Sequence, residues 1–143
     1  MSADKIPEGR TDFKCCPPIR SDSNRDQLWS ALLEGDIDFV VSDHSPCVAE
    51  LKTLDTGDFS TAWGGIGGLG LGLSLMHTEA EKRGVSLSKV VDWLSAKPAA
   101  QIGLTGKKGS LQVGADADFV LFDAKRDFIV RFVFISFGLA VLG

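Results

Sequence analysis

Cysteine is scarce in this sequence. Only three cysteines occur among 143 residues, and two of them, Cys15 and Cys16, are adjacent. Small secreted domains depend on a spaced, even-numbered set of cysteines that forms a disulfide framework. The composition excludes that class of protein and favours a reducing compartment. We therefore expect the protein in the cytoplasm.

Clustered positive charge is also missing. Fifteen Lys and Arg stand against nineteen Asp and Glu, which gives a net charge of -4, and adjacent basic residues occur only as short pairs, at 82–83, 107–108 and 125–126. Nucleic-acid binding requires a basic patch or stripe, so we expect no nucleic-acid partner. Residues 1–14 are charged from the fourth position on and contain no apolar core, so we expect no secretory signal.

The length also sets limits. A chain of 143 residues is enough for one domain, whereas a complete (β/α) barrel takes about 250. Hydrophobic residues make up 44%, which can supply a core. Residues 128–143 form an apolar tail with Arg131 as its one charge, shorter than the ~20 residues of a spanning helix. We therefore divide the chain into 1–127 and a divergent tail at 128–143, and we do not expect membrane association.

Two patterns early in the chain predict an α/β fold. Apolar residues recur at helical spacing between Ser23, which is read as the start of a helix, and Gly35, which ends it. Residues 37–41 are almost continuously apolar, which is typical of a strand buried on both faces of a parallel sheet. A helix followed by such a strand forms one step of an α/β fold.

Further helices and one more strand follow. The second half of the glycine-rich segment 61–76 predicts a helix packed on a sheet, with Gly64, Gly68 and Gly72 permitting close packing. Apolar spacing predicts a helix over 87–94 opened by Ser86, and Pro98 predicts another that runs to 104. Residues 118–122 are predicted to form a strand.

Asp43 is the most informative polar residue. It follows the predicted strand 37–41, and the carboxyl ends of strands carry the active sites of α/β barrels and open sheets. Its carboxylate is placed either for metal ligation or proton transfer, or for capping the turn before Pro46. His44 is either a second polar site residue or a surface residue of the following loop. His77 is expected at a solvated or core-edge position of a helix.

Two apparent motifs carry less weight. Gly65, Gly67 and Gly70 match the spacing of a dinucleotide-binding loop, but no buried strand precedes them and no strand ending in an acid follows. Cys47 could join Cys15 and Cys16 around zinc, yet the chain contains no C-x-x-C pair. We favour neither interpretation.

Several segments together resemble the C-terminal part of the allantoinase branch of the cyclic amidohydrolases, which also include dihydroorotases and hydantoinases. The resemblance spans about residues 3–123, and its last segment resembles the element that leads many amidohydrolases from the barrel back to a small β-sandwich. The segments are KCCPPIR at 14–20, LW at 28–29, GDID at 35–38, VSDHSPC at 41–47, AWGGI at 62–66 and GADADFV at 114–120.

The resemblance implies the C-terminal part of a metal-dependent (β/α)8 barrel with the start of the return to a small β-sandwich, and hence an incomplete barrel. Its implied reaction opens the hydantoin ring of allantoin to give allantoate, with two zinc ions that activate a hydroxide. Asp43 matches the aspartate that binds one metal and transfers the proton. Cys16 and Gly65 match positions whose backbone contacts the substrate.

The resemblance also implies that this chain lacks most of the metal ligands. The family's H-x-H pair, its carboxylated lysine and two further histidines would lie upstream of residue 1. We therefore expect the chain alone to be inactive. We expect homo-oligomer formation only of the complete enzyme. The alternatives are a dihydroorotase- or hydantoinase-type substrate, and a non-catalytic truncated isoform that acts as an interaction module.

Overall fold

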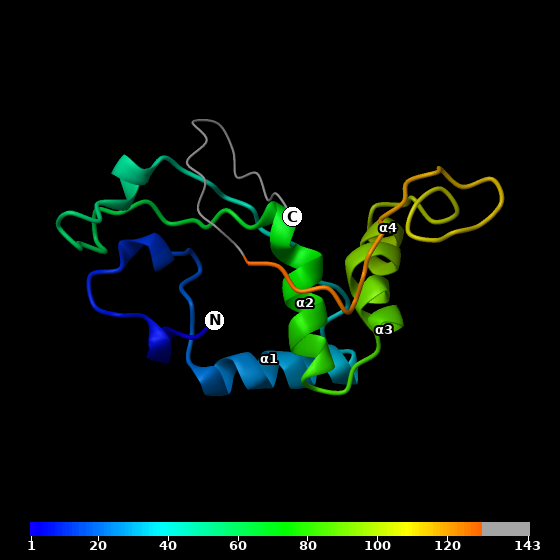
Figure 1. Cartoon of the computed structure of the whole chain (residues 1–143), viewed down its shortest axis with the longest axis horizontal. Helices are drawn as coiled ribbons and strands as arrows, with labels where there is room; N and C mark the ends of the chain where they lie inside the picture. The colour runs from blue at the N-terminus through cyan, green and yellow to red at the C-terminus, as the bar shows by residue number, and fades with distance from the viewer. Residues whose placement is uncertain (130–143) are drawn as a thin grey trace. The chain divides into compact units, whose positions relative to one another are not determined.

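The computed structural model describes residues 1–129, which fall into two compact units (Figure 1). Unit 1 comprises Met1–Ile37 and Ser42–Leu69, and unit 2 comprises Asp38–Val41 together with the described residues from Gly70 onward. The predicted tail at 128–143 lies almost wholly outside the described residues.

Helix α1, Asp22–Glu34, is the main element of unit 1. The Ser21 hydroxyl accepts a hydrogen bond from the Asn24 N–H, so Ser21 is the N-cap and the helix begins two residues before the predicted start at Ser23. Gly35 ends the helix with φ +91°, the left-handed conformation that glycine adopts most readily. The predicted helix and its stop are confirmed.

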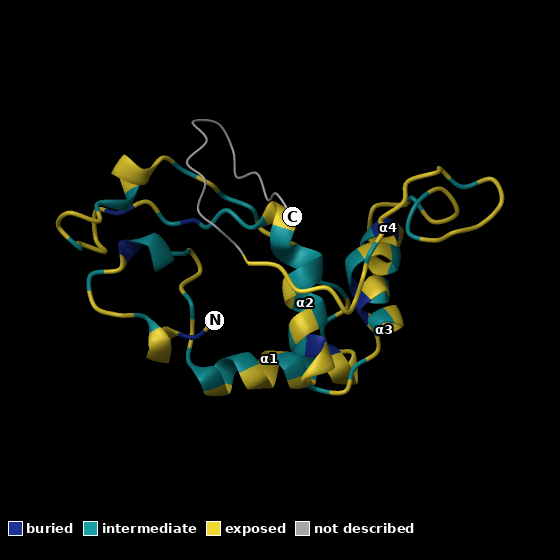
Figure 2. Cartoon of the chain, in the orientation of Figure 1, coloured by how far each residue is buried: buried dark blue, intermediate teal, exposed yellow. Residues whose placement is uncertain are grey.

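Short 3-10 turns form most of the remaining regular structure of unit 1. They are η1 (Ala3–Lys5), η2 (Thr11–Phe13) and η3 (Ala49–Lys52). The buried side chains are few, and Figure 2 shows dark blue only in short stretches of the ribbon. They are Ser2, Thr11, Leu32 and Ala62. With such a small core, unit 1 depends on hydrogen bonds between its loops for much of its organisation.

Unit 2 is helical, and its helices lie beside one another. The short turn η4 (Leu69–Leu71) leads into α2 (Gly72–Glu81), which packs against α3 (Leu87–Val91). The Ser86 hydroxyl caps α3 as predicted, and the helix continues through a π-helical turn η5 (Asp92–Ala96) into α4 (Lys97–Gln101). The two helices predicted over 87–104 are therefore one continuous run, which ends three residues early because Gly103 turns left-handed with φ +75°.

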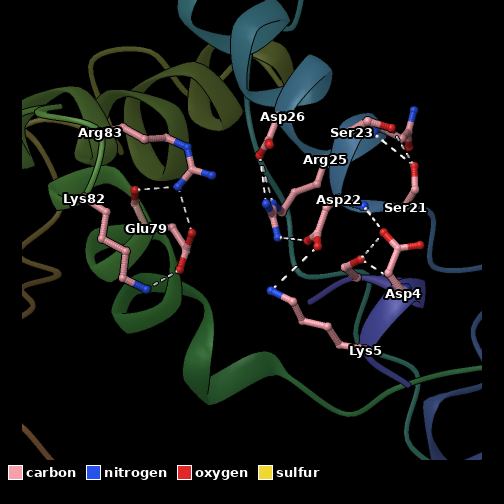
Figure 3. Close-up of polar contacts among 12 residues, drawn as sticks. Asp4, Lys5, Ser21, Asp22, Ser23, Arg25, Asp26, Glu79, Lys82 and Arg83 are labelled. Atoms are coloured by element: carbon pink, nitrogen blue, oxygen red, sulfur yellow. Dashed lines mark hydrogen bonds and ion pairs between the residues drawn. The ribbon is translucent and has the colours of Figure 1, made fainter. Parts of the chain in front are cut away.

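The core of unit 2 lies along these helices. Its buried residues are Ala80, Val90, Trp93 and Ala99. The last turn of α2 carries an ion-pair cluster in which the Glu79 carboxylate accepts from Lys82 at 2.6 Å and from Arg83 at 2.7 Å (Figure 3). These two charged bonds lower the pKa of Glu79 to about 2, with Lys82 as the larger cause.

The two predicted strands are wrong within residues 1–129, where the single β-bridge joins Thr105 and Lys108. Residues 37–41 form no ladder, and the Val40 N–H donates instead to the Trp93 carbonyl at 3.1 Å. Residues 118–122 are largely exposed, with Leu121 fully so. A strand is stable only beside a partner that takes up its N–H and C=O groups, and the described chain provides none.

The predicted role of the glycines is also wrong. Nothing lies within 4 Å of a Cβ atom placed at Gly68 or Gly72, so neither residue permits close helix packing, and the sheet expected beneath α2 is absent from residues 1–129. Gly64 does make a close contact, but with a loop. No helix among the described residues is both long and apolar enough to cross a membrane.

Candidate functional site

Three loop segments of unit 1 meet through their backbones. They are residues 14–16, 43–47 and 63–68. The Gly65 N–H donates to the Lys14 carbonyl at 3.0 Å, and the Ser45 N–H donates to the Ile66 carbonyl at 3.1 Å. The glycine-rich segment is thereby bonded to both of the other two. Segments that the sequence places tens of residues apart form one cluster, which contains every predicted site residue.

Glycine is required at the centre of this cluster. A Cβ atom at Gly64 would lie 2.6 Å from the Sγ of Cys16, and one at Gly65 would lie 2.6 Å from the carbonyl oxygen of Ser45. Both distances are shorter than real Cβ contacts. Gly64, which precedes Gly65, therefore lies against the side chain of Cys16. Cys16 is exposed, whereas Gly65 is buried.

Asp43 precedes this contact by two residues and has an unusual backbone. Its φ is +44°, in the left-handed region that non-glycine residues seldom occupy. The residue is exposed, and the described part of the chain offers its carboxylate no hydrogen-bond partner. Among the described residues, the Asp43 carboxylate therefore does not cap the turn before Pro46, and that interpretation is wrong. The carboxylate is accessible. Its roles in metal binding and proton transfer stay predictions.

His44 holds the glycine-rich loop. Its Nδ1 accepts hydrogen bonds from the N–H groups of Gly68 at 3.0 Å and Leu69 at 3.1 Å. Because Nδ1 is the acceptor, this geometry assigns the proton of the neutral ring to Nε2. The ring is half-buried, so His44 is not a freely solvated surface residue. Its contacts organise the loop next to Asp43.

Lys52 is a member of the cluster that the sequence analysis missed. It ends η3, and its Nζ donates to the carbonyls of Lys14 and Trp63, both at 3.1 Å, and to that of Gly65. An ammonium group has three protons, and here each one meets a backbone oxygen. No sequence motif signals such a contact, because its acceptors are main-chain atoms that any residue could supply.

The described residues do not complete a metal centre. Within residues 1–129, no group of three or more His, Cys, Asp or Glu side chains could hold an ion. Asp43 is a single carboxylate, and the neighbouring His44 uses Nδ1 for the loop. His77 belongs to unit 2, where its ring packs edge-on against Phe122 at the edge of the core. Of the two positions predicted for His77, the core-edge one is confirmed.

The comparisons with known proteins identify the family. The sequence profile of the Amidohydrolase family matches residues 6–141, nearly the whole chain. The chain therefore belongs to the amidohydrolase family, whose members are generally metal-dependent hydrolases.

The similar proteins are named allantoinase and hydantoinase. The chain is 54% identical over 123 residues to an allantoinase from Saccharomyces cerevisiae, covering 86% of this chain and 26% of that protein. It is 51% identical over 130 residues to an allantoinase from Streptomyces avermitilis, covering 91% and 28%. Among solved structures, an L-hydantoinase from Arthrobacter aurescens matches with a TM-score of 0.73 at 36% identity, covering 82% and 26%.

These matches also define the coarse fold. The chain resembles a quarter of a barrel-type amidohydrolase, and it spans about a quarter of the length of the curated relatives it matches. The resemblance to the allantoinase branch is confirmed. The division at residue 127 and the roles of Asp43, Cys16 and Gly65 stay predictions.

Proposed function

We propose that this chain is the C-terminal part of an allantoinase-like cyclic amide hydrolase, which opens the hydantoin ring of allantoin to allantoate. The observation that carries the proposal is the backbone cluster in which Gly65 contacts the loops that contain Cys16 and Asp43. It accompanies sequence identities near 50% to proteins named allantoinase. The chain is also about 35% identical to hydantoinases, so a hydantoinase-type substrate is the alternative.

The predicted residues have different roles in this proposal. The Asp43 carboxylate, exposed at the end of its loop, takes the proton of the attacking water and passes it to the ring nitrogen that leaves. The backbones of Cys16 and Gly65 contact the substrate ring. A binuclear zinc centre would take Asp43 as one ligand, and residues 1–129 do not complete it.

The proposal is tested in a chimera. Residues 1–127 replace the matching segment of the Saccharomyces cerevisiae allantoinase, and allantoate formation is measured. We expect an active chimera, an Asp43→Asn chimera with at least about a hundredfold lower kcat, and an Asp55→Asn chimera with unchanged kcat, since Asp55 is another exposed aspartate of unit 1. Equal activity of the Asp43→Asn and unsubstituted chimeras would contradict the role of Asp43.

The chain by itself is proposed to be inactive, because its described residues supply one carboxylate to a reaction that needs several metal ligands. Purified chain is assayed for allantoate with and without added zinc. Turnover that depends on the metal would overturn this part of the proposal.

A second candidate function is a non-catalytic interaction module. It is favoured by large apolar side chains of unit 2 that are at least two-thirds exposed, namely Ile102, Leu111, Val113, Phe119, Val120, Leu121 and Ile129. Apolar exposure of this kind marks surfaces that bind other polypeptides. Co-expression with a full-length allantoinase tests it, and failure to recover the two together would remove this candidate.

We propose the cytoplasm as the compartment, since all three cysteines are free thiols. Self-association is proposed only for a complete enzyme and is measured there by sedimentation.

A further inference from the structure

The Lys52 ammonium joins two of the three loops of the cluster. Its acceptors are the carbonyl of Lys14 on one loop and the carbonyls of Trp63 and Gly65 on another. The Gly65 N–H donates to the same Lys14 carbonyl, at 3.0 Å. Lys52 and Gly65 therefore share one acceptor, and loss of either donor affects the same backbone contact.

The backbone of Lys52 is itself fixed. The side chain of Thr11, which is completely buried, donates its hydroxyl proton to the Lys52 carbonyl. Lys52 is half-buried, and Thr53 after it turns left-handed with φ +45°. The ammonium therefore projects from an anchored residue rather than from a mobile loop.

An ammonium is suited to this position. Hydrogen bonds from a charged donor are stronger than those between neutral groups, and the three protons of Nζ can reach carbonyls from different directions. An apolar side chain of the same length would leave three carbonyls without this donor. An arginine would present a planar group of donors, which does not converge on three oxygens in the same way.

We propose that Lys52 is a positioning residue, which holds the loop that contains Cys16 and the loop that contains Gly65 at the spacing that the substrate ring requires. This inference rests on the proposed function for the identity of the substrate. The contacts of Lys52 with the backbone carbonyls are independent of that function. Lys52 contacts no reacting atom in this proposal and acts only through the carbonyls it binds.

Amine reactivity tests the contact in the unsubstituted full chain. Each lysine amine is acetylated with a limiting reagent, and rates are read by mass spectrometry. We expect Lys52 to react at least about tenfold more slowly than the exposed Lys97, because its amine must first leave three acceptors. Equal rates at the two positions would overturn the proposal without any substitution, and so independently of whether a variant folds.

Substitution tests the consequence. Amide hydrogen exchange is measured by NMR in the full chain and in its Lys52→Met and Lys52→Arg variants, with Lys97→Met as the matched control. We expect exchange of the Gly65 amide to become at least about tenfold faster in Lys52→Met, less so in Lys52→Arg, and to be unchanged in Lys97→Met. Exchange of the Val90 amide in unit 2 serves as the reference for general unfolding. Unchanged Gly65 exchange in Lys52→Met would overturn the proposal, as would an equal acceleration at Val90.

Titration with allantoin separates this inference from the proposed function. We expect allantoin to shift the Cys16 and Gly65 amide resonances of the full chain, and Lys52→Met to raise the apparent Kd about tenfold. If allantoin shifts neither resonance while Gly65 exchange still depends on Lys52, the proposed substrate fails and the positioning contact stands. If allantoin binds both proteins equally, the positioning role fails and the proposed substrate stands.

Discussion

The backbone of Gly65 lies against Ser45 so closely that a Cβ atom at residue 65 would stand 2.6 Å from the Ser45 carbonyl oxygen and 2.7 Å from its hydroxyl. The Ser45 carbonyl is a backbone atom and cannot rotate away. We therefore expect Gly65→Ala to lower the free energy of unfolding by about 1–3 kcal/mol, the usual cost of overpacking. Urea denaturation measures the change.

Gly68 provides the matched control for that experiment. It lies in the same loop, has no atom within 4 Å of an added Cβ, and does not require a positive φ. Gly68→Ala should leave stability unchanged or raise it by up to about 1 kcal/mol, because alanine restricts the unfolded chain. Equal destabilisation by both substitutions would show that the Ser45 contact is not the cause.

The two buried ring nitrogens of His77 provide a second prediction. Neither ring nitrogen finds a hydrogen-bond partner among the described residues, and the ring meets Phe122 edge-on with 5.0 Å between centroids. A phenylalanine keeps the ring contact and removes two unsatisfied polar atoms. We expect His77→Phe to raise the free energy of unfolding by about 1 kcal/mol, and His77→Ala to lower it by a similar amount. A destabilised His77→Phe protein would indicate that the nitrogens have partners after all.

The ion pairs of Glu79 predict a dependence of stability on pH. Its pKa is lowered from an ordinary 4.5 to about 2, so the stability it contributes is fully present above pH 4.5 and is lost as the pH falls through about 2. The side chain is about a third exposed, which limits the two pairs together to about 1 kcal/mol. NMR titration of the carboxyl measures the pKa.

The neighbouring Glu81 controls for that titration, since it is an exposed glutamate of the same helix. Glu79→Gln should reduce the loss of stability between pH 5 and pH 2, whereas Glu81→Gln should leave that loss as it is. The difference should shrink in 1 M salt, because exposed ion pairs are screened. Equal effects of the two substitutions would contradict a specific role for Glu79.

The left-handed backbone of Asp43 allows substitutions that distinguish a structural role of this residue from a catalytic one. Asparagine tolerates φ near +44°, so Asp43→Asn should change the stability of the chain by less than about 0.5 kcal/mol. A β-branched residue does not, and Asp43→Val should cost about 1–2 kcal/mol, unlike Asp55→Val at an exposed position without a positive φ. Thermal unfolding of the three variants checks this difference. A large loss in Asp43→Asn would show that the carboxylate is structural.

The helices could be predicted from the sequence because their signals are local. Gly35 stops α1 and Ser86 opens α3 through contacts within one turn of the chain, and such contacts depend little on the rest of the molecule. The family could be predicted for a similar reason, since its motifs are contiguous runs of residues. Ser21 does not stand out in the sequence because Ser23 has an acid, Asp26, three residues later, whereas the residue at that spacing from Ser21 is Asn24.

The strands and the role of Lys52 could not be predicted in this way. A strand depends on a neighbour that its own sequence does not specify, and residues 37–41 find only the Trp93 carbonyl. Lys52 acts on main-chain oxygens, which leave no trace in side-chain composition. The cluster of loops therefore follows only from the folded structure, although Asp43, Cys16 and Gly65 are each predicted as site residues.

The π-helical turn at Asp92–Ala96 bears on how this region tolerates changes in length. A π turn accommodates one residue more than an α turn, while Val90 before it and Ala99 after it both remain buried. Removing Ser95, whose side chain is exposed, would convert the widened turn into an ordinary one and leave the flanking faces in phase. Within the run from residue 87 to 101, a single-codon deletion is therefore best absorbed at this turn.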